Sequence, residues 1–184
     1  KKIDRYMLIV FPFLSYCAVI GYKKFYQNLK SFSGKRVFKI LLFLLIVFFV
    51  GFPIINLYPY HFTYTSPLCG TPASANKIIG QKPFGVGIPK LKEVILERYS
   101  DKYGGEPKLG FYDSIPMKTI YPNSKVFDVR TYGPSNYDLL ILAINEEMPE
   151  KVLENKQYVF EKDYSLWING LEYWRIYVKK EVSE

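Results

Sequence analysis

The first six residues of the chain are the group best suited to chemistry. They read Lys1-Lys2-Ile3-Asp4-Arg5-Tyr6 and place three cations directly before an apolar stretch. If that stretch crosses a membrane, the cations lie at the depth of the lipid headgroups, where ammonium and guanidinium groups can bind the oxygens of a lipid-linked phosphate. The alternative is that these long side chains only extend toward water from a helix end. On physical grounds alone, this simpler alternative is preferred.

The remaining residue types predict neither a catalytic set nor a metal site. The sequence contains one histidine, His61, and no Ser/His/Asp arrangement in a recognisable order. Cys17 and Cys69 have no Cys or His neighbour at zinc-ligand spacing, and two cysteines do not form a disulfide framework. We therefore expect no catalytic residue, no metal and no cofactor in this chain.

Two further patterns superficially resemble functional motifs. Gly80, Gly85 and Gly87 precede a predicted helix, as glycines do in phosphate-binding loops, but their spacing fits neither common form of such a loop. The prolines in and beside this segment favour a structured linker instead. Glu146-Glu147 is interpreted as part of a solvated loop rather than as an acid/base pair.

The positive charge of the chain is confined to its first third. Residues 1–58 contain nine Lys or Arg and one acid, whereas residues 59–184 contain sixteen of each sign. A nucleic-acid-binding domain needs a basic surface to neutralise phosphates, and the balanced second part has no such excess. The sequence therefore predicts no nucleic-acid partner, and the high isoelectric point is interpreted as a sign of membrane topology.

Two apolar stretches are predicted to cross a membrane. The first runs from about Tyr6 to Tyr22 and contains Pro12, and its seventeen uncharged residues just suffice for a hydrocarbon core of roughly 30 Å. A cleaved signal peptide is the alternative, but it usually ends at a small-residue cleavage site. The second runs from about Val37 to Leu57, with an unbroken aliphatic and Phe run from Ile40 to Val50. Aromatic residues typical of a membrane interface follow it: Tyr58, Tyr60, Phe62 and Tyr64.

Basic residues between the two stretches predict the orientation. The loop at residues 23–36 carries five Lys or Arg and no acid, which places it in the cytoplasm. The N-terminal end and the long C-terminal part then lie outside the cytoplasm. Lys1, Lys2 and Arg5 argue for the opposite orientation, but they are fewer. We interpret the loop as an orientation signal that also contacts anionic lipid.

The residues after the second stretch predict a small α/β sandwich with a mixed sheet. Residues 65–90 are rich in Pro, Gly, Ser and Thr and predict a loop segment. A helix is predicted from about Ile88 to Tyr103, with Pro89 in its first turn and apolar residues at helical spacing: Leu91, Val94, Ile95 and Tyr99. The continuous apolar run at 138–144 predicts a central strand covered on both faces.

The other predicted elements are shorter. Strands are predicted at residues 108–113, 125–130 and 158–164, with a turn at 114–116 and a short helix at 149–155. A closing hairpin is predicted from residues 167–169 and 174–179, turning at Asn169-Gly170. This order of elements suggests the small α/β sandwich with a mixed sheet.

Three blocks of the sequence, in the same order, resemble GT-C glycosyltransferases of the family-39 type, which are related to protein O-mannosyltransferases and aminoarabinose transferases. Residues 4–13 (DRYMLIVFPF) look like the family's RYLLP…P signature. Residues 58–70 (YPYHFTYTSPLCG) are similar to its HPYYLSYFNPLVGG stretch, although Tyr58 stands where the family has its first His. Residues 163–177 (DYSLWINGLEYWRIY) look like the P-x-Y-T-V-R-L-N-G ending. The family's GWGEG stretch is only partly kept, since residues 80–87 retain glycines without its Trp and Glu.

The resemblance implies transfer of a sugar from a polyprenyl-phosphate-linked donor to an acceptor outside the cytoplasm. The family's catalytic acid lies in the first extracytoplasmic loop, so the chain is expected to be the C-terminal part of a longer enzyme, and Asp4 is not that acid. Lys2 and Arg5 are the candidates for binding the donor phosphate. Tyr60 and His61 are the candidates for the acceptor-side interface. The implied partners are membrane lipid, the donor, and upstream transmembrane helices of the same enzyme.

The sequence therefore predicts three regions. Residues 1–58 form a membrane helical hairpin of two transmembrane helices, residues 59–87 a Pro/Gly-rich connecting segment, and residues 88–184 an extracytoplasmic α/β domain. The leading hypothesis is the C-terminal part of a multi-pass glycosyltransferase of the cell membrane. The alternative is a non-enzymatic, membrane-tethered binding or interaction module, which fits the neutral domain and the lack of a catalytic set.

Overall fold

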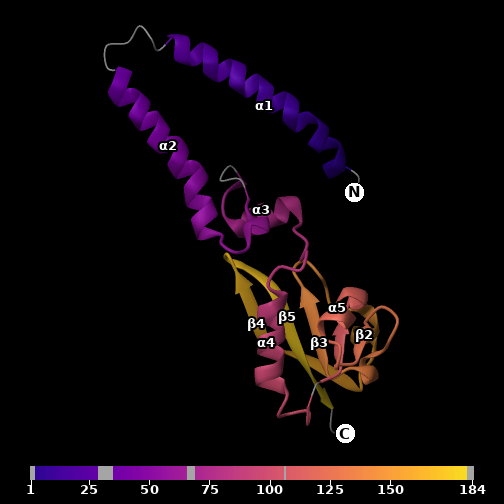
Figure 1. Ribbon diagram of the computed structural model, residues 1–184. Helices are drawn as coiled ribbons and strands as arrows, with labels where there is room; N and C mark the ends of the chain where they lie inside the picture. The colour runs from indigo at the N-terminus through magenta and orange to yellow at the C-terminus, as the bar shows by residue number, and fades with distance from the viewer. Residues whose placement is uncertain (1–2, 29–34, 66–68, 106, 182–184) are drawn as a thin grey trace. The chain divides into compact units, whose positions relative to one another are not determined.

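The computed structural model describes residues 3–28, 35–65, 69–105 and 107–181 (Figure 1). The chain divides into two compact units, the first ending at Asn56 and the second beginning at Leu57. The first unit contains the two long helices, and the second contains the sheet.

The first unit consists of two helices, α1 (Ile3–Asn28) and α2 (Lys35–Asn56). Among the described residues, the segment Val37–Asn56 of α2 is long and apolar enough to cross a membrane, with a mean hydropathy of 2.8 and none of that stretch buried. It corresponds to the second predicted span. The first predicted span lies inside α1, which contains Pro12, and its crossing of a membrane stays a prediction.

The second unit is built on a mixed five-stranded sheet with the order β2-β1-β3-β5-β4. Its strands are β1 (Leu109–Phe111), β2 (Val126–Asp128), β3 (Leu139–Ala143), β4 (Tyr158–Ile168) and β5 (Leu171–Glu181). β1 runs parallel to both β2 and β3, whereas β5 is antiparallel to β3 and β4. The predicted mixed sheet with helices is confirmed.

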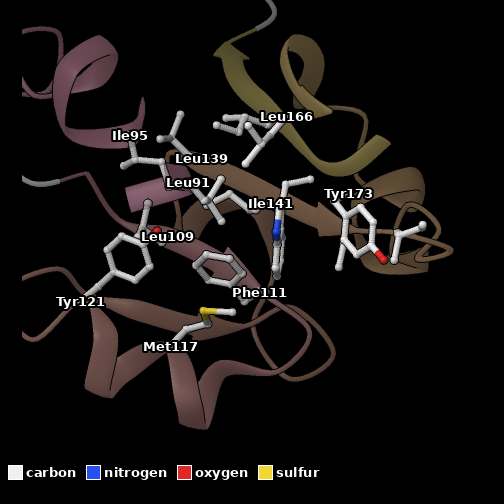
Figure 2. Packing of buried hydrophobic residues seen from close by; sticks show 14 of the residues in the cluster. Leu91, Ile95, Leu109, Phe111, Met117, Tyr121, Leu139, Ile141, Leu166 and Tyr173 are labelled. Atoms are coloured by element: carbon white, nitrogen blue, oxygen red, sulfur yellow. The ribbon is translucent and has the colours of Figure 1, made fainter. Parts of the chain in front are cut away.

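The central strand is β3, as the apolar run predicted. All five of its residues are buried, because side chains cover both faces of the sheet. On one face lies α4 (Ile88–Tyr99), which buries Leu91, Ile95 and Tyr99. Figure 2 shows part of this core, including Leu91, Leu109, Leu139 and Ile141. The helix was therefore predicted correctly on its buried face, although it ends at Tyr99 rather than Tyr103.

The turn of the closing hairpin is confirmed, but its first arm and the separate strand predicted at 158–164 form one continuous strand, β4. β4 and β5 each have eleven residues and meet at Asn169-Gly170, where φ is 48° and 77°. Asn and Gly tolerate this left-handed backbone, and two such residues in succession match the twist of a two-residue hairpin turn.

Two predictions in the loops were wrong. The predicted turn at 114–116 is the start of a helix, α5 (Ser114–Ile120), and the predicted loop at 65–90 contains the helix α3 (Pro72–Ile79). In α3 the hydroxyl of Thr71 accepts a hydrogen bond from the backbone N–H of Ser74 at 3.2 Å, and Gly80 ends the helix in a left-handed conformation. Such caps stabilise a short helix despite its low intrinsic propensity. Shorter helical segments lie at His61–Thr63, Pro134–Asn136 and Glu150–Glu154 (α6).

The described residues between Leu57 and Gly87 belong to the second unit, and several of them pack onto the sheet. The indole N–H of Trp174 donates to the carbonyl oxygen of Val86 at 2.7 Å, and the hydroxyl of Tyr173 donates to Oε1 of Gln81 at 2.7 Å. The side-chain amides of Asn76 and Asn145 donate to each other's oxygens at 2.9 and 2.8 Å. The unit therefore includes the residues that the sequence assigned to a connecting segment.

Candidate functional site

A cleft of about 410 Å³ lies at the carboxyl ends of the parallel strands β1 and β3. Tyr112 and Asp113 follow β1 at this edge, and Ala143 and Glu146 lie at the end of β3. The chain leaves β1 through α5 toward β2 on one side, while β3 lies on the other side. Ligands of α/β sheets bind at such a point, where the strand connections diverge and leave a crevice outside the strand ends. The volume also lies within the usual range for small-molecule sites.

The base of the cleft is apolar and firmly packed. Phe111, Met117 and Trp174 line it, and these three residues are almost completely buried. Phe111 and Met117 lie next to each other in Figure 2. The rings of Phe111 and Trp174 meet edge to face with centroids 6.4 Å apart, and the indole is held by its hydrogen bond to Val86. A ligand thus meets a preformed apolar surface.

One wall of the cleft is a turn with unusual backbone conformations. Phe84 has a φ of 41° and an exposed fraction of 77%, and it stands at the cleft beside Gly85. A residue other than Gly in this left-handed region costs about 1–2 kcal/mol, and such strain is frequent at ligand sites. Gly87 follows with a φ of 75°, and a Cβ atom there would lie 2.3 Å from Cδ1 of Ile168. The turn is therefore closely fitted to the end of β4.

The charged groups of the cleft are Glu146, Asp113 and Lys82. Oε2 of Glu146 accepts a hydrogen bond from the backbone N–H of Ala143 at 2.7 Å. Burial raises the pKa of Glu146 above its ordinary value, and the negative charge of Asp113 adds to this rise, while the hydrogen bond from Ala143 opposes it. Asp113 and Lys82 are exposed at the surface.

Two arginines hold the backbone on either side of the cleft. Arg175 of β5 donates to the carbonyl oxygens of Ala143, at 3.0 Å, and of Glu146. Arg130 donates to the carbonyl oxygen of Tyr112 at 2.6 Å and forms an ion pair with Asp128 at 2.9 Å. Hydrogen bonds from Arg130 lower the pKa of Asp128, so this pair stays charged at neutral pH. Both carboxylate-bearing loops of the cleft are thus fixed by charge-assisted hydrogen bonds.

The arrangement suits a small ring-shaped ligand that carries hydroxyl or amino groups. The apolar base can pack against the face of such a ring, and the carboxylates can accept hydrogen bonds from its substituents. Within the described residues, no three potential metal-ligating side chains lie together. The apolar base and the two carboxylates together suit recognition of a ligand by packing and hydrogen bonding.

Two of the predicted site residues, Tyr60 and His61, belong to the same unit as this cleft but do not line it. Tyr60 is partly buried against the core, and its carbonyl oxygen accepts hydrogen bonds from the N–H and hydroxyl of Thr63 at 3.0 and 2.7 Å. His61 is exposed, with its ring centroid 6.2 Å from that of Tyr58. Neither residue lines the cleft. Lys2 lies outside the described residues, and for Arg5 only its place in α1 is described.

Sequence reasoning missed the cleft residues. Glu146 was interpreted as part of a solvated loop, but the structure half-buries it and joins its carboxylate to the end of β3. Asp113 and Phe84 were not selected either. The available signal was that Asp113 ends one predicted strand and Glu146 closely follows another. It could not be used without knowing that β1 and β3 are parallel neighbours.

Comparisons with known proteins were made at the level of family, sequence and structure. No family model, no curated protein and no solved structure matches this chain. The resemblance to glycosyltransferases thus rests on the three sequence blocks, and the cleft is interpreted from its own residues.

Proposed function

We propose that this chain is the C-terminal part of a membrane glycosyltransferase, which transfers a sugar from a polyprenyl-phosphate-linked donor to an acceptor outside the cytoplasm. In this proposal, α1 and α2 are the last two membrane helices, residues 23–36 lie in the cytoplasm, and the α/β unit lies outside. The catalytic acid lies in a loop of the enzyme upstream of α1.

One contact carries the proposal, because it joins the second and third sequence blocks. Nδ2 of Asn169, in the third block, donates a hydrogen bond to Oγ1 of Thr63, in the second, at 2.7 Å. Thr63 is 3% exposed, and a buried hydroxyl needs hydrogen-bond partners to replace those it loses from water. Two blocks that resemble one family and depend on each other physically are more informative than two separate short matches.

The third block also forms the cleft. Trp174 lies at its base, and Arg175 fixes the loop that carries Glu146. We propose that the cleft binds a hydroxylated ring of the acceptor, with Tyr60 and His61 at the acceptor-side interface nearby. Lys2 and Arg5 bind the donor phosphate at the outer membrane surface. In this proposal the first unit binds the donor and the second unit binds the acceptor.

The test is sugar transfer by the full-length product of the reading frame in proteoliposomes with a radiolabelled polyprenyl-phosphate sugar. Losing a charge-assisted hydrogen bond costs about 1.5–3 kcal/mol, so Arg5→Ala should reduce transfer at least about tenfold. Arg5→Lys should retain part of the activity. Lys156→Ala, which removes an exposed cation of the α/β unit, is the matched control. Unchanged transfer by Arg5→Ala would show that Arg5 does not bind the phosphate.

A membrane-tethered binding module is the second candidate function. It is favoured by the fact that the cleft is formed entirely by residues of the second unit. If the full-length product binds carbohydrate but transfers no sugar from polyprenyl-phosphate donors, this second function is supported. A reading frame without further hydrophobic spans and without an acidic first loop would lead to the same conclusion.

A further inference from the structure

One end of the α/β unit exposes large apolar side chains, and we refer to these residues as the aromatic end. Their exposed fractions are 87% for Phe62, 76% for Tyr58, 75% for Ile78, 61% for Trp167, 57% for Ile79 and 51% for Tyr64. Single exposed apolar residues are common on soluble domains, but a group gathered at one end indicates a surface that contacts something.

The aromatic end is assembled from three separate segments around the β4–β5 turn. Thr63 is hydrogen-bonded to Asn169 in the turn. Pro72, at the start of α3, lies next to Gly170, because a Cβ atom there would be 3.8 Å from Cγ of Pro72. Trp167 lies on β4, two residues before Asn169. In Figure 1, α3 lies at the same end of the sheet as this turn.

Only a short stretch of chain connects the apolar helix to the aromatic end. The segment long enough to cross a membrane ends at Asn56, and Thr63 follows seven residues later. Seven extended residues span at most roughly 25 Å. If α2 crosses a bilayer, the Asn169–Gly170 turn cannot lie far from the surface of that bilayer.

The residue types of the aromatic end fit a lipid interface. Trp and Tyr are enriched at the depth of the headgroups, and exposed Phe and Ile add apolar area that can enter the acyl boundary. Residues 59–184 contain sixteen acids and sixteen Lys or Arg, so the unit that carries the aromatic end has no net charge. The attraction is therefore hydrophobic, and it does not require anionic lipid.

We propose that the aromatic end rests in the headgroup region of the bilayer that α2 crosses. This inference rests on one part of the proposed function, the insertion of α2, and not on the transfer chemistry. It has a consequence for the cleft. Ala143, at the end of β3, pairs with Trp174 near the start of β5, so the cleft lies at the same end of the sheet as the β4–β5 turn. The cleft then opens close to the headgroups, where a bound acceptor ring can meet the lipid-linked donor.

The two tryptophans of the chain allow a direct test. Trp167 is exposed in the aromatic end, whereas Trp174 is 2% exposed inside the core. The 184-residue chain is reconstituted into bilayer discs whose lipids carry bromine near the headgroup end of the acyl chain. We expect bromine to quench Trp167 fluorescence, because interfacial residues enter roughly 5–10 Å into this boundary. The quenching should disappear in Trp167→Phe, in which only Trp174 remains.

Two variants and one lipid series sharpen the test. The triple variant Phe62→Ser/Ile78→Ser/Ile79→Ser should weaken quenching of Trp167. Leu153→Ser is the matched control, since Leu153 is 68% exposed on α6, which precedes the opposite end of β4. Raising the fraction of anionic lipid should leave the quenching unchanged.

Resistance to alkaline extraction reports insertion of the chain independently. An inserted chain with unquenched Trp167 overturns this inference alone. Shielding of Trp167 that varies with the protein-to-lipid ratio, without quenching by bromine, assigns the surface to a second copy of the chain and also overturns it. A chain that alkali extracts refutes the membrane span in the proposed function, and this inference with it.

Discussion

Nδ2 of Asn169 donates a hydrogen bond to Oγ1 of Thr63 across 2.7 Å, although the two residues are 106 positions apart in the sequence. The same hydroxyl donates to the carbonyl oxygen of Tyr60 at 2.7 Å, so it acts as donor and acceptor at once. Through Thr63, the residues that leave the apolar helix are joined to the β4–β5 turn. This contact therefore links the first residues of the α/β unit to its last hairpin.

Thr63→Val should destabilise the α/β unit. Valine keeps the shape of threonine but leaves the Asn169 amide and the Tyr60 carbonyl oxygen without this partner, which costs about 1–3 kcal/mol of the free energy of unfolding. The measurement is denaturant unfolding followed by tryptophan fluorescence, which reports only on this unit. Thr63→Ser retains the hydroxyl and should recover most of the loss. Thr119→Val, at an exposed position, is the control. If Thr63→Val lowers the free energy of unfolding no more than Thr119→Val does, the prediction is wrong.

Gly87→Ala should be more destabilising than Gly80→Ala. Both positions have a positive φ, at 75° and 63°, so both variants bear the strain of alanine in the left-handed region, about 1–2 kcal/mol. At Gly87 the new Cβ atom also meets Ile168 at 2.3 Å, and such overpacking adds about 1–3 kcal/mol. At Gly80 nothing lies within 4 Å. Comparing the two free energies of unfolding separates the contact from the backbone strain, and equal values would refute the close fit of this turn.

Glu146→Gln should change how stability depends on pH. In the wild-type chain, the pKa of Glu146 is raised above 4.5 by burial, so as pH rises the unfolded state loses its proton first. The free energy of unfolding therefore falls with pH above 4.5, until Glu146 also ionises in the folded state. Glutamine cannot ionise, and its side-chain oxygen can still accept from Ala143. As pH rises above 4.5, the free energy of unfolding of Glu146→Gln should therefore increase relative to that of the wild-type chain. A difference independent of pH would show that Glu146 titrates normally.

Asn145→Gly should loosen the segment that covers the end of the sheet. Glycine tolerates the φ of 61° at this position, so the variant mainly removes the side-chain amide that pairs with Asn76 and donates to the carbonyl oxygen of Gln81 at 2.7 Å. Backbone amides of α3 should exchange with solvent faster, because local opening becomes easier, while those of β3 should not change. Lys77→Ala alters α3 but keeps the amide pair, and it should leave both exchange rates near wild type. Unchanged exchange of α3 in Asn145→Gly would show that other contacts hold the helix.

Much of the fold could be predicted because its signals are local. The apolar run at 138–144 indicated the central strand, the spacing of Leu91 and Ile95 indicated the buried face of α4, and Asn169-Gly170 indicated the hairpin turn. The helices α3 and α5 were missed, since each is short and contains Pro and Ser, which are equally common in turns. Whether such a segment forms a helix or a turn is decided by capping, as by Thr71 in α3, and by packing against the rest of the unit.

The sequence by itself determined an apolar segment at about 37–57, a neutral α/β unit after it, and three blocks that resemble one enzyme family. Only the tertiary structure decided that Thr63 meets Asn169, that Asp113 and Glu146 line one cleft, and that the aromatic end surrounds one turn. The physical reason is that these relationships depend on strand order and direction. The parallel pairing of β1 with β3 and the antiparallel pairing of β3 with β5 bring distant residues to one edge. Local periodicity contains no information about that pairing.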